Sequence, residues 1–493
     1  MAGADAPGRP PEDDAGGAAH GGPGVPPDTP PFAWYGDDFT GATDTLMNAS
    51  QCGLRALLFL GVPSPAQLAA AGPLDALGIA GTSRSMAPAP MRAELSRVAA
   101  FLATLDAPVW HYKVCSTFDS APHVGSIGTA ITTLRAHRAN PFVPVVGGQP
   151  NLGRYCLFGH LFASAGAGGD VVRIDRHPTM SRHPVTPMRE SDLRVHLGLQ
   201  GLGTVASVPF TAYAQGEAAL HERLASIAAG APDAVLMDVS REDELAAIGA
   251  AIWRQALRAP LLAVGPSSVV RALAAAWPFA RAEQRDEGAA ARDTSAGASS
   301  AAPAGDRADA HEGAAPRRAV RRDPGAPVFV VSGSLSPVTA RQIGEARSYE
   351  KQPLDAARLA GGDAATLDAA AARAIASLRA GRHVLAHTSR VDAPAPSAGV
   401  DDPVALARGC GRLLKAVLGA FPVSRAGVAG GDTSSHALDA LEAWALGYAG
   451  ELSPGVALCR LRADAPELDG LEIILKGGQM GRPDVFEALL RGR

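Results

Sequence analysis

The stretch YGDDFTGATDTL, residues 35–46, places two adjacent aspartates, Asp37 and Asp38, between an apolar run and a helical pattern. The preceding PFAWY predicts a buried strand, and residues 40–52 predict a helix with Thr40 as its cap. A strand that leads directly into a helix is the repeating unit of a parallel sheet, where ligands bind beyond the carboxyl ends of the strands. The two carboxylates therefore occupy a position typical of a reaction centre, although helix capping by one of them is a simpler explanation.

The same pattern recurs along the chain. In the first half, apolar runs predict further strands at residues 54–60, 108–115, 233–239 and 260–265. A helix is predicted over residues 123–137. Three strand–turn–helix units follow in the second half: PVFVVSGSLSP, AGVAGGDTSSHALDALEAWAL and LEIILKGGQMGRPDVFEALL. In the first of these units, Ser336 is the expected N-cap and Pro337 the first helical residue. The alternation predicts an α/β fold with largely parallel sheets.

Length and composition predict two domains. A chain of 493 residues is too long for one ordinary core. Residues 1–30 and 281–325 contain few large apolar side chains, which predicts a disordered tail and a disordered linker or insertion. The globular parts are then residues 31–280 and residues 326–493. We expect the active site in the cleft between these two domains.

Charge and cysteine content argue against several classes of protein. The net charge of −4 and the scattered basic residues do not indicate a surface that binds nucleic acid or an anionic membrane. No apolar run is long enough to span a membrane, and the N-terminus does not resemble a signal peptide. The five cysteines are odd in number and form no C-x-x-C pair. They indicate reduced thiols in a cytoplasmic protein rather than a metal or disulfide framework.

Three glycine-rich loops in the second half predict a phosphate-binding surface. SGSLS, GGDTSS and KGGQMG each follow a predicted strand, where glycine lets the backbone approach a ligand and a helix N-terminus offers free N–H groups. A tight turn explains each loop alone, and the lack of G-x-x-x-x-G-K-[ST] and G-x-G-x-x-G disfavours P-loop and ordinary dinucleotide folds. The candidate nucleotide-binding residues are Ser334, Ser336, Gly430, Gly431, Asp432, Thr433, Lys476, Gly477 and Gly478.

Polar loops in the first half predict a proton acceptor beside a small anion. Phosphoryl transfer needs a carboxylate that takes the proton of the attacking hydroxyl, and Asp38 or Asp37 can supply it. Basic and hydroxyl side chains in GTSRS and KVCSTFDS suit a polyhydroxylated anion, although ordinary loop polarity explains each of them alone. The candidate substrate-binding residues are Arg84, Lys113, Ser116, Thr117 and Asp119.

A segment rich in proline and arginine, residues 173–193, is interpreted as an anion-binding or lid-like loop, with a rigid surface loop as the alternative. Its two histidines, His177 and His183, lack the spacing of helical metal ligands, and no residue of the chain is assigned to a metal.

Seven motifs together resemble the four-carbon acid sugar kinase family. They are, in the family's order, DDFTGATD, KVCSTFDS, RHPVTPM, SGSLSP, AGGDTSS, SPGV and LKGGQMG. The resemblance implies an N-terminal domain for the acid sugar and a C-terminal domain for the nucleotide. It implies transfer of the γ-phosphate of ATP to the terminal hydroxyl of threonate, erythronate or 3-oxo-tetronate. CSTFDS is similar to the 3-oxo-tetronate kinase branch.

Two departures from the family pattern concern the substrate. Trp34, Tyr35 and Gly36 stand where the family has an aliphatic run and alanine, and Met480 replaces a phenylalanine. A branched acid sugar such as 3-oxo-isoapionate is therefore the alternative substrate.

The resulting hypothesis is a kinase that uses ATP and Mg²⁺. Arg84 and Lys113 hold the carboxylate of the acid, and Asp38, or else Asp37, deprotonates its hydroxyl. Mg²⁺ bridges the phosphates, and Asp432 supports the ion through water. A non-catalytic nucleotide or sugar-acid sensor and a nicotinamide-dependent oxidoreductase are the rival functions. The expected partners are the two small molecules, and a homodimer is left open.

Overall fold

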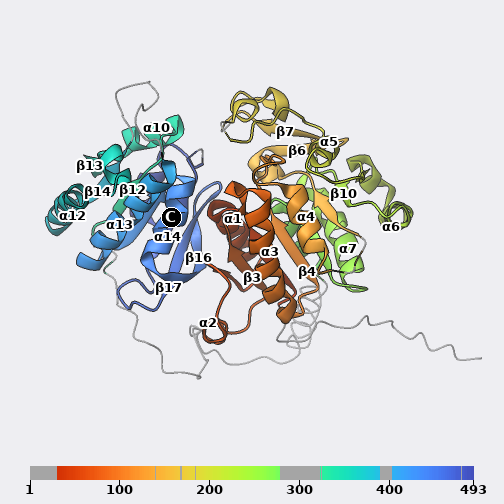
Figure 1. Ribbon diagram of the computed structural model, residues 1–493, viewed down its shortest axis with the longest axis horizontal. Coiled ribbons are helices and arrows are strands. Elements are labelled where there is room, and N and C mark those ends of the chain that lie inside the picture. Colours follow the sequence, from red (N-terminus) through yellow and green to blue (C-terminus); the bar gives the residue numbers. More distant parts are fainter. Residues whose placement is uncertain are drawn as a thin grey trace, which may run out of the picture.

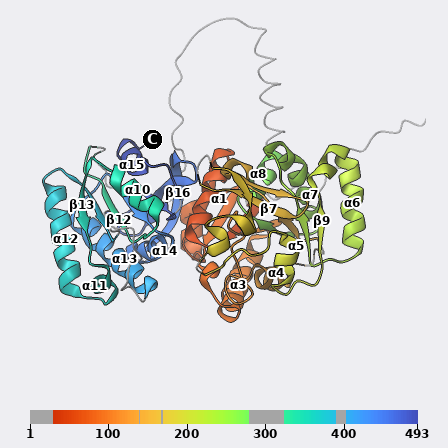
Figure 2. The same cartoon turned by 90° about the horizontal axis from the view of Figure 1, so that it is seen from above.

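The computed structural model describes residues 30–138, 140, 142–166, 169–183, 185–277, 323, 325–388, 402–478 and 480–492. Within these residues the chain forms two halves that lie side by side, each built on strands covered by helices (Figures 1 and 2). The predicted α/β architecture with mostly parallel strands is confirmed. The predicted disordered tail (residues 1–30) and linker (residues 281–325) fall almost entirely outside the described residues.

Fifteen of the described strands form one sheet that continues through both halves. Its order is β13 (Tyr349–Pro353), β14 (His383–His387), β12 (Phe329–Ser332), β15 (Arg425–Ala429), β18 (Glu472–Lys476), β17 (Val456–Ala463), β16 (Ala443–Ser453), β2 (Ala56–Phe59), β3 (Ala76–Ala80), β1 (Phe32–Gly36), β4 (Val109–Lys113), β11 (Leu261–Gly265), β5 (Pro144–Val146), β10 (Ala234–Met237) and β9 (Val205–Val208).

An antiparallel hairpin joins two blocks of parallel strands. β17 pairs with β18 of the C-terminal block, and β16 pairs with β2 of the N-terminal block. The sequence pattern predicted a helical run through AWAL, but helix α14 ends at Leu441 and β16 begins at Ala443. Cross-strand pairing and burial in the sheet override the helical pattern here, since β16 is bonded to strands on both sides.

Helices cover both faces of the sheet (Figure 1). In the N-terminal half they are α1 (Phe39–Gln51), α2 (Pro65–Ala71), α3 (Pro88–Leu102), α4 (Ile127–Arg135), α5 (Leu193–Gly198), α6 (Glu217–Ala229), α7 (Leu245–Ala256) and α8 (Ser268–Ala275). In the C-terminal half they are α10 (Pro337–Glu345), α11 (Ala356–Ala360), α12 (Ala364–Arg379), α13 (Pro403–Ala420), α14 (Gly431–Leu441) and α15 (Val485–Arg491).

The central strand β1 shows why the apolar runs are continuous. Phe32 and Trp34 belong to the core on one face of the sheet, whereas Ala33 and Tyr35 belong to the core on the other. A strand covered by helices on both faces has no polar side, so its side chains do not alternate in character. Because every residue of the run FAWYG is buried, the aspartates that follow it lie at the carboxyl end of an interior strand of the sheet.

Three of the predicted helix starts differ from the structure. The helix predicted over residues 123–137 begins at Ile127, after its N-cap Ser126. Helix α1 begins at Phe39, and its N-cap is Asp38 rather than Thr40, because Asp38 Oδ1 accepts a hydrogen bond from the Gly41 amide at 2.7 Å. The third unit of the C-terminal half does not pass directly from strand to helix, since α15 begins only at Val485. The start of α10 is confirmed, with Ser336 as N-cap.

A small antiparallel sheet stands on the N-terminal half. It consists of β6 (Arg154–Leu157), β7 (His160–Ser164) and β8 (Val171–Arg173). Asp238 fastens it to the main sheet, accepting hydrogen bonds from the amides of Phe158 and Gly159. Within the described residues, no helix combines the length and apolarity needed to cross a membrane.

Candidate active site

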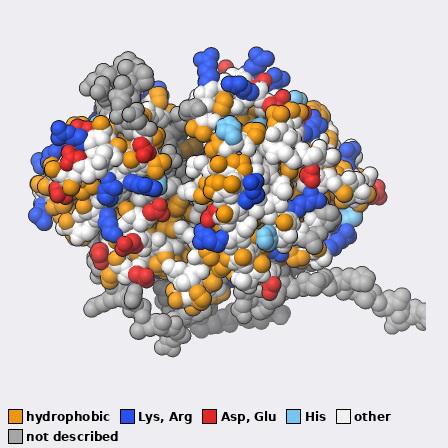
Figure 3. All heavy atoms as spheres, viewed as in Figure 1, with side chains coloured by type: hydrophobic (Ala, Val, Ile, Leu, Met, Phe, Trp, Pro, Cys, Tyr) orange, Lys and Arg blue, Asp and Glu red, His pale blue; other side chains and the backbone are white. Residues whose placement is uncertain are grey.

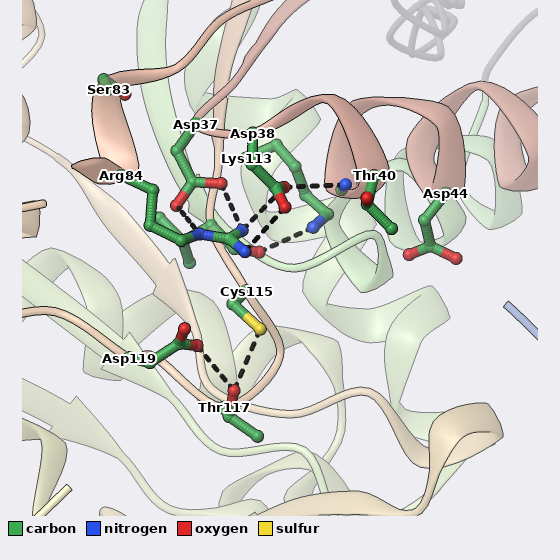
Figure 4. Close-up of polar contacts among 12 residues, drawn as sticks. Asp37, Asp38, Thr40, Asp44, Ser83, Arg84, Lys113, Cys115, Thr117 and Asp119 are labelled. Atoms are coloured by element: carbon green, nitrogen blue, oxygen red, sulfur yellow. Dashed lines mark hydrogen bonds and ion pairs between the residues drawn. The ribbon is translucent and has the colours of Figure 1, made fainter. Parts of the chain in front are cut away.

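The predicted substrate-side residues meet at the carboxyl ends of three adjacent parallel strands. In the register of the sheet, Gly36 of β1 lies beside Ala80 of β3 and Lys113 of β4. The chain segments that leave these strands therefore begin at the same level. The structure brings Asp37 and Asp38, Arg84, Lys113 and the loop of residues 115–119 into one polar cluster (Figure 4).

Arg84 lies between the paired aspartates and binds both. Its Nε and Nη2 donate to the Asp37 carboxylate at 3.1 and 2.6 Å, and its Nη1 and Nη2 donate to the Asp38 carboxylate at 2.8 Å each. Figure 4 shows the two carboxylates converging on one guanidinium group. The repulsion between adjacent aspartates is thereby offset by a shared cation. The Arg84 donors, which the sequence assigned to a substrate carboxylate, bind the protein's own carboxylates instead.

The two aspartates differ in exposure. The side chain of Asp37 is 5% exposed and that of Asp38 is 24% exposed. Burial raises the pKa of Asp37 above its usual value, and the neighbouring Asp38 adds to this effect, while Arg84 opposes it. Asp38 is the carboxylate that a bound ligand can reach more directly.

Lys113 lies beside the Asp38 carboxylate at the start of α1. Its Nζ donates to the backbone oxygen of Val114 at 2.8 Å, and the side chain is buried. Gly41 leaves room for Asp38 and Lys113 to lie this close together, because a Cβ at position 41 would lie 2.5 Å from Asp38 Oδ1 and 2.8 Å from Lys113 Nζ. Any larger residue at position 41 would displace one of the two charged groups.

The loop after β4 forms a short hydrogen-bonded chain. Cys115 Sγ lies 2.9 Å from Thr117 Oγ1, which donates to Asp119 Oδ1 at 2.7 Å. Burial opposes ionisation of Asp119, but Arg84 and these hydrogen bonds hold its pKa below the usual value. Burial raises the pKa of the Cys115 thiol to about 11, so the thiol stays protonated at neutral pH. Ser116 is buried in the same loop.

Sequence reasoning missed a second group of polar residues next to these. Asp44, one turn further along α1, accepts hydrogen bonds from Ser267 after β11 and, at 3.2 Å, from Gln149 Nε2 after β5. Arg154 lies close enough for Asp44 to act on its pKa. The signal available in the sequence was the apolar PVV at 144–146, followed by GGQP, which together mark the end of a short strand.

The three glycine-rich loops of the C-terminal half also meet at one edge, as predicted. β12, β15 and β18 are adjacent and parallel, so their loops leave the sheet side by side. Thr339 Oγ1 donates to the Gly478 oxygen at 2.9 Å and ties the first loop to the third. A Cβ on Gly478 would lie 2.9 Å from Ser334 Oγ, which shows how closely these two loops pack.

The N-terminus of α14 differs from that of α10 in its capping. Gly430 adopts φ +125°, and none of the described side chains caps the helix, whereas α10 is capped by Ser336. Amide groups of the first turn, which includes Gly431, Asp432 and Thr433, are therefore available to a ligand. The side chain of Asp432 lies outside the described part of the structure.

Lys476 places a buried positive group under the same loops. Its Nζ donates to Thr339 Oγ1 at 3.0 Å and to the Gly477 oxygen at 2.9 Å, and the side chain is fully buried. Burial lowers the pKa of Lys476 to about 7. A bound phosphate would supply the negative charge that restores the protonated form.

Replacing Lys476 with methionine is expected to stabilise the ligand-free protein at low pH. The unfolded chain holds this proton up to about pH 10.4, whereas the folded protein loses it near pH 7, so the penalty for burying the charge is complete below pH 7 and fades as pH rises. The Tm of Lys476→Met should exceed that of the wild type by at least ~3 °C at pH 6 and by less at pH 9. Lys415→Met, at an exposed position, serves as control. An equal difference at both pH values would contradict the prediction.

The two polar clusters meet where α1 approaches β18. A Cβ placed on Gly477 would lie 3.4 Å from Thr40 Cγ2, so the aspartate-bearing turn lies close to the lysine–glycine loop. The Thr40 Oγ1 atom is buried there and has no hydrogen-bond partner among the described residues. Figure 3 shows the surface hollowed between the two halves at the top of the view.

A separate pocket of about 310 Å³ lies far from this junction. Arg135, the last residue of α4, and Asp233, which directly precedes β10, line it and form an ion pair at 3.3 Å. Ligands of open α/β sheets bind at the opposite edge, so this pocket is not the candidate active site.

Comparison with known proteins identifies both halves. Residues 32–273 match the family model of a sugar-binding N-terminal domain, and residues 329–486 match that of a nucleotide-binding C-terminal domain. The chain is 37% identical over 480 residues to the 3-oxo-isoapionate kinase of Paraburkholderia graminis, with 94% of each chain covered. It is 30% identical over 462 residues to the 3-oxo-tetronate kinase of Methylobacterium radiotolerans, covering 91% of this chain and 96% of that protein.

Crystal structures at lower identity share the fold. A Haemophilus influenzae protein of family DUF1537 superposes with a TM-score of 0.64 at 22% identity, over 93% of this chain and 99% of that one. A protein from Salmonella typhimurium LT2 superposes with a TM-score of 0.68 at 21% identity, over 93% and 98% of the two chains. Taken with the two domain matches and the 37% identity, these findings show that the chain belongs to the four-carbon acid sugar kinase family.

Proposed function

We propose that the protein transfers the γ-phosphoryl group of ATP to the terminal hydroxyl of a small sugar acid. The observation that carries the proposal is the short separation between Thr40 and Gly477, which brings a pair of carboxylates close to a glycine-rich loop of the phosphate-binding type. 3-Oxo-isoapionate is the first candidate substrate, because the kinase named for it is more similar to this chain than the kinases named for 3-oxo-tetronate. Linear acids such as threonate and erythronate follow.

Asp38 is the proposed proton acceptor. The hydroxyl oxygen of the acid forms the new bond to the γ-phosphorus, the bond to the β-phosphate oxygen breaks, and the hydroxyl proton passes to the Asp38 carboxylate. The greater exposure of Asp38 compared with Asp37 supports this assignment. Arg84 holds the carboxylate in place through two hydrogen bonds, and Asp37 orients Arg84 from the buried side.

The C-terminal loops are the proposed site of ATP. Free amides at the start of α14 and the Lys476 ammonium would receive the phosphates, and Ser334, Ser336 and Gly478 would form the wall of the site. Mg²⁺, when bound with ATP, would reduce the charge repulsion on the phosphates, with Asp432 as its proposed support through water. Closure of the two halves would exclude water from the phosphoryl group.

The proposal is tested by acid-dependent ADP release, measured with a panel of linear four-carbon and branched five-carbon sugar acids. A kinase should release ADP only when its acid is present, and the acid with the highest kcat/KM identifies the substrate. Ligand binding in calorimetry without ADP release by any acid would favour a sensor. Hydride transfer to or from a nicotinamide would favour an oxidoreductase.

A further inference from the structure

Gln149 and Arg154 face the candidate site from the loop after β5. The Gln149 amide donates to the Arg154 oxygen at 2.9 Å, and the Arg154 amide donates back at 3.2 Å, so the two residues lie directly opposite each other. Residues opposite in an antiparallel pair project on the same side. The hydrogen bond from Gln149 Nε2 to Asp44 shows that this side is the one facing α1.

The Arg154 side chain is half-buried, and its guanidinium has no anionic partner in the described residues. Its Nη1 donates to the backbone oxygen of Leu152, and its Nε is buried with no hydrogen-bond partner. Burial lowers the pKa of Arg154, while Cys115 and Asp44 counteract this effect. A desolvated guanidinium with unused donors is stabilised when a carboxylate binds to it.

The other cationic side chains of the cluster already have hydrogen-bond partners within the protein. Arg84 makes four hydrogen bonds to Asp37 and Asp38, and Lys113 is packed against Asp38 with its Nζ bonded to Val114. A further carboxylate at Arg84 would meet the repulsion of two existing ones. Arg154 therefore has the strongest remaining capacity for an incoming anion.

The position of Arg154 matches the length of a short acid. The strand order β1–β4–β11–β5 puts its loop three strand spacings, or ~14 Å, from the end of β1, and an arginine side chain is long enough to cover part of that distance. Cys115, which follows the intervening strand β4, acts on the pKa of both Arg84 and Arg154 and so lies within electrostatic reach of both groups.

We infer that Arg154 binds the carboxylate of the sugar acid, with the buried Gln149 Oε1, which has no partner among the described residues, accepting one of its hydroxyl groups. The acid then lies with its charged end at Arg154 and its terminal hydroxyl at Asp38. This assignment rests on the proposed kinase function and makes Arg154 the residue that selects acids over neutral sugars.

The test compares an accepted acid with its uncharged carboxamide in wild type and Arg154→Gln. For the acid, kcat/KM should fall by ~10- to ~1,000-fold, chiefly through KM, because a buried charge contact is lost. For the carboxamide, kcat/KM should change less than ~3-fold, since no such contact exists to lose. Arg154→Lys should recover only part of the loss, because lysine lacks the planar pair of donors.

Arg138→Gln is the matched control. Arg138 is also half-buried with an unpartnered Nε, but its guanidinium lies 3.6 Å from the centroid of the Trp110 ring, near the amino end of β4. It should leave the ratio of acid to carboxamide activity unchanged. If Arg154→Gln reduces acid and carboxamide activity equally, or leaves the KM for the acid unchanged, the assignment is overturned.

Direct binding separates this assignment from the kinase proposal. Calorimetry with the acid alone should show binding to wild type and to Arg138→Gln but not to Arg154→Gln, while binding of a non-hydrolysable ATP analogue is the same in all three. Arg154-dependent binding of the acid without ADP release would overturn the kinase function and support the Arg154 assignment. ADP release with equal acid affinity in Arg154→Gln would overturn the assignment alone. No binding of the acid to wild type would overturn the Arg154 assignment, and the absence of ADP release as well would overturn the kinase function.

Discussion

Asp38→Asn should abolish most phosphoryl transfer while leaving the protein folded. Asparagine caps helices as well as aspartate, so the hydrogen bond from the Gly41 amide can be kept. It cannot accept the hydroxyl proton, and kcat should therefore fall by ~10²- to ~10⁴-fold. The KM for ATP should stay within ~3-fold of wild type, because the proposed nucleotide site lies on the other half of the molecule. Steady-state ADP release measures both constants.

Asp363→Asn provides the control for this substitution. Asp363 caps α12 by accepting hydrogen bonds from the Ala365 and Thr366 amides, far from the carboxyl-end cluster of the N-terminal half. The same change of aspartate to asparagine there should leave kcat unaffected. Unchanged kcat in Asp38→Asn would remove Asp38 as the base and direct attention to Asp37.

Arg84→Met should destabilise the protein more than any other single change considered above. It would leave two adjacent carboxylates without the cation that they share, and loss of one partner from a buried ion pair costs ~3 kcal/mol or more. The Tm should fall by roughly 6 °C or more, as measured by calorimetry. Activity should also be lost, because the Asp38 carboxylate is no longer held in position.

The pH dependence and a second substitution show whether charge causes the effect. Without Arg84 the pKa of Asp37 should rise further, so the penalty is present above that pKa and relieved below it. Arg84→Met should therefore lose more stability at pH 8 than at pH 5. Adding Asp37→Asn should restore part of the Tm. Arg425→Met, which breaks a pair with the partly exposed Glu472, should cost less, and an equal loss in both variants would contradict the interpretation.

The local sequence predicted the strands and helices, and it predicted that the polar loops lie at the carboxyl-end edge of the sheet. The apolar runs before Asp37, Ser116 and Ser334 all form buried strands, since continuous apolar segments are stable only when a sheet is covered on both faces. The cap of α10 followed from Ser336 and Pro337 alone. The cap of α1 could not be predicted in this way, because Asp38 and Thr40 are both residue types that cap helices. Which of them caps α1 depends on the position at which the preceding strand ends.

Interactions between distant segments were not predictable from local pattern. The junction of the halves depends on β16, whose sequence continues a helical pattern but pairs with β2, nearly 400 positions earlier in the chain. Gln149 and Arg154 follow a strand of three residues, too short to give a clear period. Their relation to Asp44 arises only when β5 takes its place in the sheet.

The sequence by itself determined the fold class, the family motifs and the paired carboxylates at a strand end, because these depend on side-chain character and short spacing. Only the tertiary structure decided which charges are already paired. The sequence predicts that Arg84 binds the substrate, but in the fold Arg84 binds Asp37 and Asp38. By contrast, the buried Nε of Arg154 has no hydrogen-bond partner among the described residues. The physical reason is that desolvation and ion pairing depend on contacts between residues distant in the chain, which set the free energy of each buried charge.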